Sequence, residues 1–345
     1  MTTHNLLEST IKVLTAKGKG ILAADESTAT ITKRFTALNI KCTEESRRDY
    51  RELLFSTPSL NESIAGIILY EETLGQKASN GTPLPELLQK NGIIPGIKVD
   101  KGLVLLPNTR DENTTQGLDG LAERLAEYKT KGARFAKWRA VYNISTNNTP
   151  SELAIHANAE GLARYAAICQ AQGIVPIVEP EVLIDGDHTI ETCSIITEKV
   201  LHQVFYALFQ HKVSLEHIIL KPSMVISGKT CPIKAGIEQV ATETIKVLRR
   251  TVPAAVPTIN FLSGGQSSQD ATAHLNAMNN LFPSLPWNLS YSYARALQDD
   301  CMKIWQGEMK NTGAAQKALY KRAKLNSLAT QGKYTTDMER ETTAA

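Results

Sequence analysis

Three stretches of the chain decide the fold: ARFAKWRAV at 133–141, TPSE at 149–152 and IVPIVEPE at 174–181. The two outer stretches are apolar without strict alternation, which is typical of parallel strands buried on both faces. The stretch between them predicts one helix, opened by a capping box at Thr149 with Pro150 in the first helical position and running toward Gln172. Strand, helix and strand in this order predict a βαβ unit.

The same unit repeats along the chain. Eight short apolar runs occur, each followed by a stretch of helical character: 20–25, 64–71, 92–100, 133–141, 174–181, 218–224, 256–264 and 289–293. The helical spacing is clear at Leu118, Leu121, Leu125 and Tyr128, which form one apolar stripe. Eight strand–helix units predict an α/β protein with a closed (β/α)8 TIM barrel.

A doubly wound open sheet is the alternative fold. Such a sheet usually has a glycine-rich turn after its first strand, where this chain reads Ala24-Asp25-Glu26-Ser27. We therefore predict a single barrel domain over residues 1–330. Residues 331–345 are polar and rich in threonine, and we expect them to form a flexible C-terminal tail.

The composition excludes several classes of partner. The 38 Lys and Arg nearly balance the 35 Asp and Glu, and the net charge of +3 is too small for a general nucleic-acid or membrane-surface binder. No apolar run approaches the ~18 residues of a membrane span, and the first 25 residues hold no apolar signal core. The five cysteines form no C-x-x-C pair, which indicates reduced thiols. We expect a cytoplasmic protein that binds neither nucleic acid nor membrane.

We expect no functional site at the histidines or at a basic run near the C-terminus. The seven histidines form no H-E-x-x-H or other close ligand set, so we expect no metal. They are His4, His156, His188, His202, His211, His217 and His274. A basic run near the C-terminus predicts a solvated helix face; it consists of Lys317, Lys321, Arg322 and Lys324.

Charged side chains stand at the ends of the apolar strands, where burial requires a partner or a use. They are Asp25, Lys98, Lys137, Arg139, Glu179, Glu181 and Lys221, joined by Ser263 and Arg295. Positions 137, 179, 221 and 263 are each 42 residues apart, one βα unit per step, which predicts equal heights on four neighbouring strands. Strand geometry puts residues 137 and 139 on one face, as it does 179 and 181. We expect this face to point inward, at the carboxyl end of the barrel, where active sites of this fold lie.

Several lysines and carboxylates in one pocket suit Schiff-base chemistry. A partly desolvated lysine among other cations loses its proton more readily and can attack a carbonyl, while carboxylates move protons. Ordinary ion-pair ladders are the alternative. The stretch FLSGGQS at 261–267, with Arg295 beyond the next strand, predicts a phosphate site rather than a simple turn. Lys33 and Arg34 fit a second phosphate or a solvated helix face equally well.

Seven motifs then resemble one known family. They are GILAADEST (20–28), GIKVDKG (96–102), FAKWR (135–139), VEPE (178–181), LKP (220–222), FLSGGQ (261–266) and SYARAL (292–297). In this order they closely resemble class I fructose-1,6-bisphosphate aldolase, and the match covers about residues 7–334. The resemblance implies a metal-independent, cofactor-free lyase of glycolysis and gluconeogenesis. Such an enzyme cleaves fructose 1,6-bisphosphate reversibly to dihydroxyacetone phosphate and glyceraldehyde 3-phosphate. The resemblance also suggests a homotetramer.

The resemblance further implies roles for individual residues. Lys221 would form the Schiff base, Glu179 would act as its acid and base, and Glu181 would support Glu179. Lys137 would hold charge beside the iminium, and Asp25 would take the C4 hydroxyl proton. Arg139 would contact substrate. One phosphate would bind to Ser263, Gly264 and Arg295, and the other near Ser27, Thr30, Lys33, Arg34 and Lys98.

The sequence departs from the family pattern at three places. Its last residues are Thr343-Ala344-Ala345, where family members usually carry a tyrosine that assists proton exchange at the enamine. This departure bears on enamine protonation and on the preference for the bisphosphate over fructose 1-phosphate. Thr30 replaces a common serine, and Ala294 replaces a common glycine. Two alternatives stay open: a Schiff-base aldolase for another ketose phosphate, such as sedoheptulose 1,7-bisphosphate, and a non-catalytic scaffold on the same fold.

Overall fold

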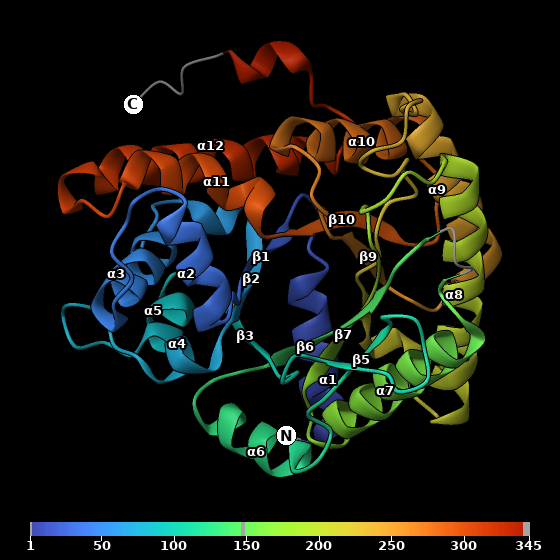
Figure 1. Ribbon diagram of the computed structural model, residues 1–345. Coiled ribbons are helices and arrows are strands. Elements are labelled where there is room, and N and C mark those ends of the chain that lie inside the picture. The colour runs from blue at the N-terminus through green and yellow to red at the C-terminus, as the bar shows by residue number, and fades with distance from the viewer. Residues whose placement is uncertain (1, 146–148, 341–345) are drawn as a thin grey trace.

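A closed barrel of eight parallel strands forms the centre of the protein in the computed structural model, which describes residues 2–145 and 149–340 (Figure 1). Around the barrel the strand order is β1-β10-β9-β8-β7-β6-β3-β2. The strands are β1 (Gly20–Ala24), β2 (Ile64–Leu69), β3 (Ile94–Lys98), β6 (Phe135–Tyr142), β7 (Val175–Val182), β8 (Ile219–Leu220), β9 (Thr258–Phe261) and β10 (Asn288–Tyr293). Each lies within or overlaps one predicted apolar run. The predicted (β/α)8 barrel is confirmed, and the open doubly wound sheet is wrong.

Helices connect the barrel strands and surround the barrel, while α1 precedes β1 (Figure 1). They are α1 (Thr3–Leu14), α2 (Thr28–Thr36), α3 (Glu44–Phe55), α4 (Glu71–Gly75), α5 (Leu84–Lys90), α6 (Leu121–Thr130), α7 (Glu152–Ala171), α8 (Ile190–Gln210), α9 (Ile237–Thr251), α10 (Ser268–Leu281), α11 (Arg295–Trp305) and α12 (Thr312–Ala329). Short 3-10 turns are η1 (Leu60–Glu62), η2 (Leu215–His217), η3 (Met309–Asn311) and η4 (Thr336–Glu339). The predicted stripe on α6 is buried at Leu121, Leu125 and Tyr128.

An antiparallel hairpin of β4 (Leu103–Leu105) and β5 (Asn113–Thr115) follows β3, and the sequence did not predict it. This hairpin brings Glu112 to the start of α7. Both the backbone N–H and the hydroxyl of Ser151 donate to the Glu112 carboxylate, at 2.7 and 2.5 Å. The Ser151 hydroxyl also accepts from the Ala154 N–H at 3.2 Å, so Ser151 is the N-cap. The predicted cap at Thr149 is therefore wrong, because a carboxylate from a distant turn selects the later residue.

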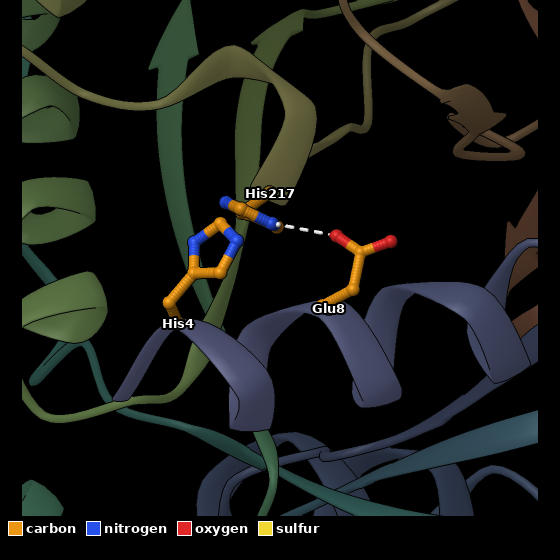
Figure 2. Close-up of side chains that lie close together, drawn as sticks. All are labelled: His4, Glu8 and His217. Carbon is orange, nitrogen blue, oxygen red and sulfur yellow. Dashed lines mark hydrogen bonds and ion pairs between the residues drawn. The ribbon is translucent and has the colours of Figure 1, made fainter. Parts of the chain in front are cut away.

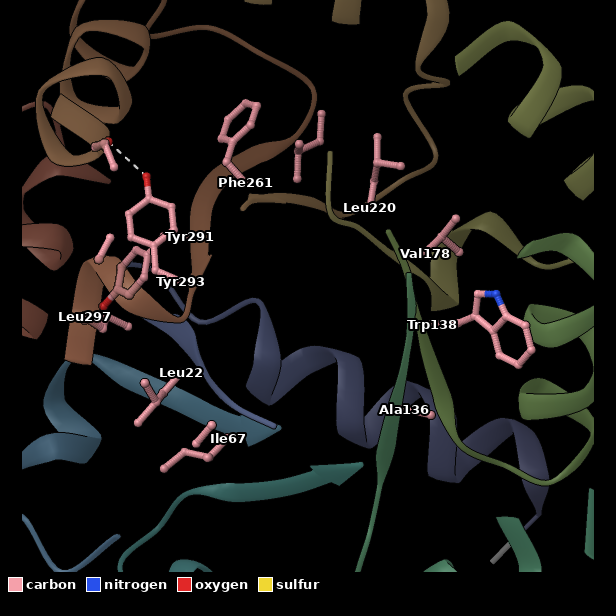
Figure 3. Close-up of a cluster of buried hydrophobic side chains, with 14 of the residues drawn as sticks. Leu22, Ile67, Ala136, Trp138, Val178, Leu220, Phe261, Tyr291, Tyr293 and Leu297 are labelled. Atoms are coloured by element: carbon pink, nitrogen blue, oxygen red, sulfur yellow. Dashed lines mark hydrogen bonds between the residues drawn. The ribbon is translucent and has the colours of Figure 1, made fainter. Parts of the chain in front are cut away.

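Two layers of apolar side chains make up the core. Inside the barrel, Ile21, Phe135, Ile177 and Ile219 are fully buried and pack with one face of α1, which closes the amino end. Outside, the alternate residues of the same strands pack against the surrounding helices, as Trp138, Val178 and Leu220 do in Figure 3. This alternation leaves the inward positions of the upper barrel to polar side chains.

Strand register refines the predicted heights of the charged residues. Glu179 on β7 is paired with Arg139 on β6, and Lys137 is paired with Ile177. The prediction that equal 42-residue spacing gives equal height is therefore wrong for Lys137 and Glu179, and Ser263 lies beyond the end of β9. The physical reason is that strands of a closed barrel are tilted and staggered. The predicted pairing of 137 with 139, and of 179 with 181, on the inward face is confirmed, because all four line one cavity.

Residues after 330 continue to contact the barrel's helices. The Tyr334 N–H donates to Asn276 Oδ1 on α10 at 2.9 Å, and its ring is buried. Arg322 on α12 forms two hydrogen bonds of 2.7 Å with the Glu339 carboxylate. Arg322 is thus buried, and the predicted solvated face is wrong at this residue. The predicted domain boundary at 330 precedes these contacts, and residues 341–345 of the predicted tail lie outside the described residues.

All five cysteines are free, and four of them are buried. None of the helices in the described part of the chain is both long and apolar enough to cross a bilayer.

Candidate active site

One cavity of about 430 Å³ opens at the carboxyl ends of the barrel strands. Every site residue predicted from the sequence lines it: Asp25, Ser27, Thr30, Lys33, Arg34, Lys98, Lys137, Arg139, Glu179, Glu181, Lys221, Ser263, Gly264 and Arg295. Another cavity, of about 400 Å³, lies at the amino ends beside Lys17, Lys19 and Trp287, and it holds none of these residues. The chemistry-bearing side chains therefore converge at one end of the barrel.

Buried charges at the base of this cavity contact one another directly. Lys221 follows β8, and its Nζ lies 3.2 Å from Glu179 Oε1. The other oxygen of Glu179 lies 3.5 Å from Lys137 Nζ. Lys137 Nζ also contacts Asp25 Oδ2 at 2.8 Å and Asp100 Oδ2 at 3.9 Å. One carboxylate therefore bridges two lysines, and the mutual attraction offsets part of the cost of burying these charges.

The electric field of this cluster determines the charge of Asp25. Burial of the Asp25 carboxyl raises its pKa, but the ammonium groups of Lys137, Lys221 and Lys98 outweigh burial and lower the pKa to about 2. Burial disfavours the Lys137 ammonium, yet the carboxylates of Asp25, Glu179 and Asp100 hold its pKa well above the ordinary lysine value. At neutral pH, Asp25 is a carboxylate that can accept a proton and Lys137 is a permanent cation.

Arg139 and Glu181 form a second ion pair on the cavity wall, where Arg139 Nε donates to Glu181 Oε2. Burial of the Arg139 guanidinium lowers its pKa, but the carboxylates of Glu181, Glu179 and Asp100 together outweigh burial and raise that pKa. About a third of the Arg139 side chain stays accessible, at 36%. The pair therefore places one cationic group within reach of a molecule in the cavity.

Two polar rims flank the base. After β9, Gly264 and Gly265 have positive φ angles of +53° and +84°, a conformation that favours glycine. A Cβ atom at Gly265 would lie 3.6 Å from Arg295 Nη2, so these loops adjoin at the first residue of α11. On the other side, Ser27 caps the N-terminus of α2 by accepting from the Thr30 N–H at 3.4 Å. Both rims offer the N–H groups, hydroxyls and cations that bind phosphate.

Arg34 lies at the edge of the cavity and does not face solvent on a helix surface. Its guanidinium pairs with Glu26 and lies 3.0 Å from Asp299 Oδ1, so the predicted solvated face is wrong at this residue. Glu26 also accepts from Arg51 Nη2 at 2.7 Å. These carboxylates hold Arg34 in place at the edge of the cavity.

Sequence reasoning missed two acidic residues near the site. Asp100 lies 3.5 Å from Lys98 Nζ and also faces Lys137. Its position two residues after Lys98 was the available signal, because period-two geometry can place it on the same face. Glu26 lines the cavity beside Asp25. It could have been found in the sequence because it is a second charged residue directly after the same apolar strand.

This fold and this cavity define a (β/α)8-barrel enzyme whose lysines and carboxylates meet at the carboxyl ends of the strands. Comparison with known proteins identifies the family. Residues 6–345 match the family described as fructose-bisphosphate aldolase class-I.

Relatives with this name are similar over most of their length. The non-muscle fructose-bisphosphate aldolase of Lethenteron camtschaticum is 56% identical over 322 residues, covering 93% of this chain and 88% of its own. Cytosolic fructose-bisphosphate aldolase 4 of Arabidopsis thaliana is 55% identical, covering 93% and 82%. The Plasmodium falciparum aldolase, solved with TRAP and a small-molecule inhibitor, has a TM-score of 0.95 and 52% identity over 96% of both chains. The chain belongs to the class-I fructose-bisphosphate aldolase family, and the resemblance stated from its sequence motifs is confirmed.

Proposed function

We propose that this chain reversibly cleaves fructose 1,6-bisphosphate to dihydroxyacetone phosphate and glyceraldehyde 3-phosphate, with Lys221 as the Schiff-base residue. The contact of 3.2 Å between Lys221 Nζ and Glu179 Oε1 carries this proposal. It pairs a buried amine with the group that can take its proton, at the base of a cavity with phosphate-binding chemistry on both rims.

The first step attaches the substrate. Glu179 takes a proton from the Lys221 ammonium, and the free amine attacks the C2 carbonyl of the open-chain sugar to give a carbinolamine. Glu179 then returns the proton to the C2 hydroxyl, which leaves as water, and the C2–N bond becomes an iminium. Because one carboxylate serves in both directions, its contact with both lysines keeps it close to the reacting nitrogen.

Bond cleavage takes place at the Asp25 side of the cavity floor. The Asp25 carboxylate takes the C4 hydroxyl proton, the C3–C4 electrons move into the iminium, and glyceraldehyde 3-phosphate leaves as the aldehyde. Asp25 gives up this proton to solvent, a proton from solvent adds at C3 of the remaining enamine, and water then hydrolyses the iminium to release dihydroxyacetone phosphate. The Asp25 pKa of about 2 keeps this base ionised at neutral pH. Lys137, 2.8 Å from Asp25, contributes fixed positive charge beside the reacting carbons.

The two rims fit the two phosphates. Ser263, Gly264 and Arg295 would bind one, with the glycine conformation giving close approach to backbone N–H groups. Ser27 and Thr30 lie at the N-terminus of α2 and Lys33 in its last turn; these three would bind the other phosphate, with Lys98 and Arg34 nearby. Arg139 and Glu181 would orient the hydroxyls between them. No metal or cofactor takes part in these steps.

Trapping the covalent intermediate tests the proposal. Borohydride with dihydroxyacetone phosphate should reduce the iminium to a secondary amine on Lys221, located by peptide mass spectrometry, and EDTA should leave cleavage intact. The Lys221→Met variant should lose the adduct and at least about 10⁴-fold in kcat. Lys317→Met, an exposed lysine outside the cavity, is the matched control. An adduct on another lysine, or cleavage abolished by EDTA, would overturn the proposal.

The alternatives differ in substrate or in the need for Lys221. Values of kcat/KM for fructose 1,6-bisphosphate, fructose 1-phosphate and sedoheptulose 1,7-bisphosphate rank the possible substrates. A non-catalytic scaffold requires that no substrate is cleaved and that Lys221→Met changes nothing.

We further propose a cytoplasmic homotetramer. Cytoplasmic location is supported by the cytosolic Arabidopsis relatives. Association is supported by large apolar side chains exposed on α7 and α8, namely Leu153, Ile195, Tyr206 and Phe209. Sedimentation equilibrium should give four chains per particle, and Phe209→Lys should shift it toward smaller species if this surface is the interface. A monomer at all concentrations would contradict the tetramer.

A further inference from the structure

Three potential metal ligands meet at the amino end of the barrel, on the side opposite the aldolase cavity. His4 and Glu8 lie one turn apart on α1, and His217 is the last residue of η2, separated from β8 only by Ile218 (Figure 2). One ligand atom from each residue lies within 4.8 Å of the other two, and no other group of three such side chains occurs in the part of the chain that the structure describes. The sequence did not indicate this cluster because 209 residues separate Glu8 from His217.

We propose that His4, Glu8 and His217 bind one Zn²⁺ ion. Two imidazoles and one carboxylate are a known zinc donor set, and water would complete a tetrahedron. With zinc–ligand distances near 2.0–2.2 Å, ligand atoms of such a site lie about 3.3 Å apart. Glu8 Oε2 and His217 Nε2 are already 3.0 Å apart. His4 is exposed, so its ring is free to turn toward them.

The surroundings of His217 present the correct nitrogen to the ion. The Ser214 hydroxyl donates to Glu216 Oε2 at 2.9 Å and therefore accepts from His217 Nδ1, also at 2.9 Å. With zinc bound, Nδ1 would keep its proton and donate it to Ser214, and Nε2, which contacts Glu8 at 3.0 Å, would bind the ion. A ligating histidine that donates its second N–H to a neighbouring oxygen is the usual arrangement around protein-bound zinc.

The two histidine rings lie next to each other. Their centroids lie 5.0 Å apart at 86°, so the rings meet edge to face rather than stacked. Figure 2 shows the Glu8 carboxylate pointing at His217 from the adjacent turn of α1. Imidazole nitrogens favour zinc and neighbouring transition metals over Mg²⁺ or Ca²⁺, which prefer all-oxygen sites.

Bound zinc would join the N-terminal helix to the strand that precedes Lys221. Apolar side chains of α1 close the amino end of the barrel, and the ion would add a link from this helix to η2. Because the cluster lies at the opposite end from the cavity, we expect zinc to change the stability of the fold and to leave aldolase cleavage unchanged.

Titration of the untagged, metal-free full chain with ZnCl₂ in a calorimeter tests the site. We expect one ion per chain and a rise in Tm of about 3–5 °C at roughly a hundredfold excess of free zinc over Kd. His4→Gln and Glu8→Gln alter exposed side chains, so the variants should fold. Each should weaken binding at least about tenfold, and Ser214→Ala about tenfold. His202→Gln removes an exposed histidine on α8 and is the matched control, with unchanged binding.

Cobalt gives an independent readout. Co²⁺ in the same site should show the visible bands of a four-coordinate nitrogen–oxygen site without thiolate charge transfer, which separates it from binding at Cys42. The proposal is overturned if wild-type protein binds no zinc, if His4→Gln and Glu8→Gln bind as tightly as wild type, or if cobalt shows thiolate ligation.

Discussion

Both buried lysines of the cavity, Lys137 and Lys221, contact Glu179. Its two oxygens face Lys221 at 3.2 Å and Lys137 at 3.5 Å, so its single negative charge is shared between two cations. Glu181, two residues later on the same face, pairs with Arg139 instead. Two carboxylates on one strand therefore have different partners, and their removal should have different consequences.

Glu179→Gln keeps the shape of the side chain and removes its ability to carry protons. We expect kcat to fall about 10²–10⁴-fold, the range for loss of a general acid–base, with slower borohydride trapping on Lys221. Glu181→Gln is the matched variant and should lose less, because its carboxylate contacts an arginine and neither lysine. Steady-state and single-turnover cleavage rates give the comparison. A larger loss in Glu181→Gln would assign the acid–base role to that residue.

The charge of Asp25 depends on Lys137. The ionised carboxylate is the active form, so a pKa of about 2 keeps Asp25 active throughout the neutral range. In Lys137→Met, burial is opposed by less positive charge, and the Asp25 pKa should rise. Cleavage measured from pH 4 to 8 should then show an acidic loss of rate that wild type lacks. Lys98→Met should produce a smaller shift, since its contribution is weaker; equal profiles in all three proteins would exclude this coupling.

At the scale of elements, the inner barrel depends on glycines that make room for aromatic rings. A Cβ atom at Gly96 on β3 would lie 2.3 Å from the ring of Phe135, which is fully buried. The two strands are adjacent and their register pairs these two residues. Because residue 96 has no side chain, the ring of Phe135 fits between the paired strands β3 and β6.

Gly96→Ala should lower the free energy of unfolding by about 1–3 kcal/mol or more, because the buried ring cannot move away without disturbing the core. Gly161→Ala is the matched control: this glycine lies within α7, and apart from its two neighbours and the backbone of its own helix no atom lies within 4 Å of the added Cβ. There the substitution should stabilise the protein by about 0.5–1 kcal/mol. Urea unfolding of both variants decides the matter, and equal effects would contradict the packing argument.

For the whole molecule, buried carboxylates couple folding to pH. Burial raises the pKa of Glu26, but Arg51 and Arg34 outweigh burial and lower that pKa. Burial also raises the pKa of Glu339, but Arg322, with smaller contributions from Tyr334 and Lys321, outweighs burial and lowers that pKa. Together with Asp25, these groups bind protons more weakly in the folded than in the unfolded chain. Their stabilisation is present above about pH 4–5 and is lost as pH falls through their folded pKa values.

Urea unfolding at pH 7, 5, 4 and 3 should therefore show a free energy of unfolding that declines below pH 5, with Asp25 alone accounting for on the order of 1 kcal/mol of the decline by pH 3. Glu339→Gln should be less stable at pH 7 and should show a shallower acidic decline, because it lacks one of the depressed carboxyls. Stability that stays constant to pH 3 would contradict the pKa directions given above.

Local pattern was sufficient to predict the strands and most of the site. Residues such as Lys137 and Lys221 could be found because a charge within an apolar strand is conspicuous, and period two determines which face it occupies. The β4–β5 hairpin could not be found, since its strands have three residues each and all of them except Thr115 are exposed or partly exposed. Arg34 could not be placed, because its partner Asp299 lies 265 residues away in sequence.

The sequence by itself determined the eight strand–helix units, the inward face of the charged residues and the family. These features follow from hydrophobic periodicity and from motifs that neighbouring residues carry together. Only the tertiary structure decided which charges pair, as with Arg322 and Glu339, and that Ser151 rather than Thr149 caps α7. The tertiary structure also showed that His4 and Glu8 lie beside His217. Such contacts depend on the stagger of the strands and the path of the chain between them, and a local pattern contains neither.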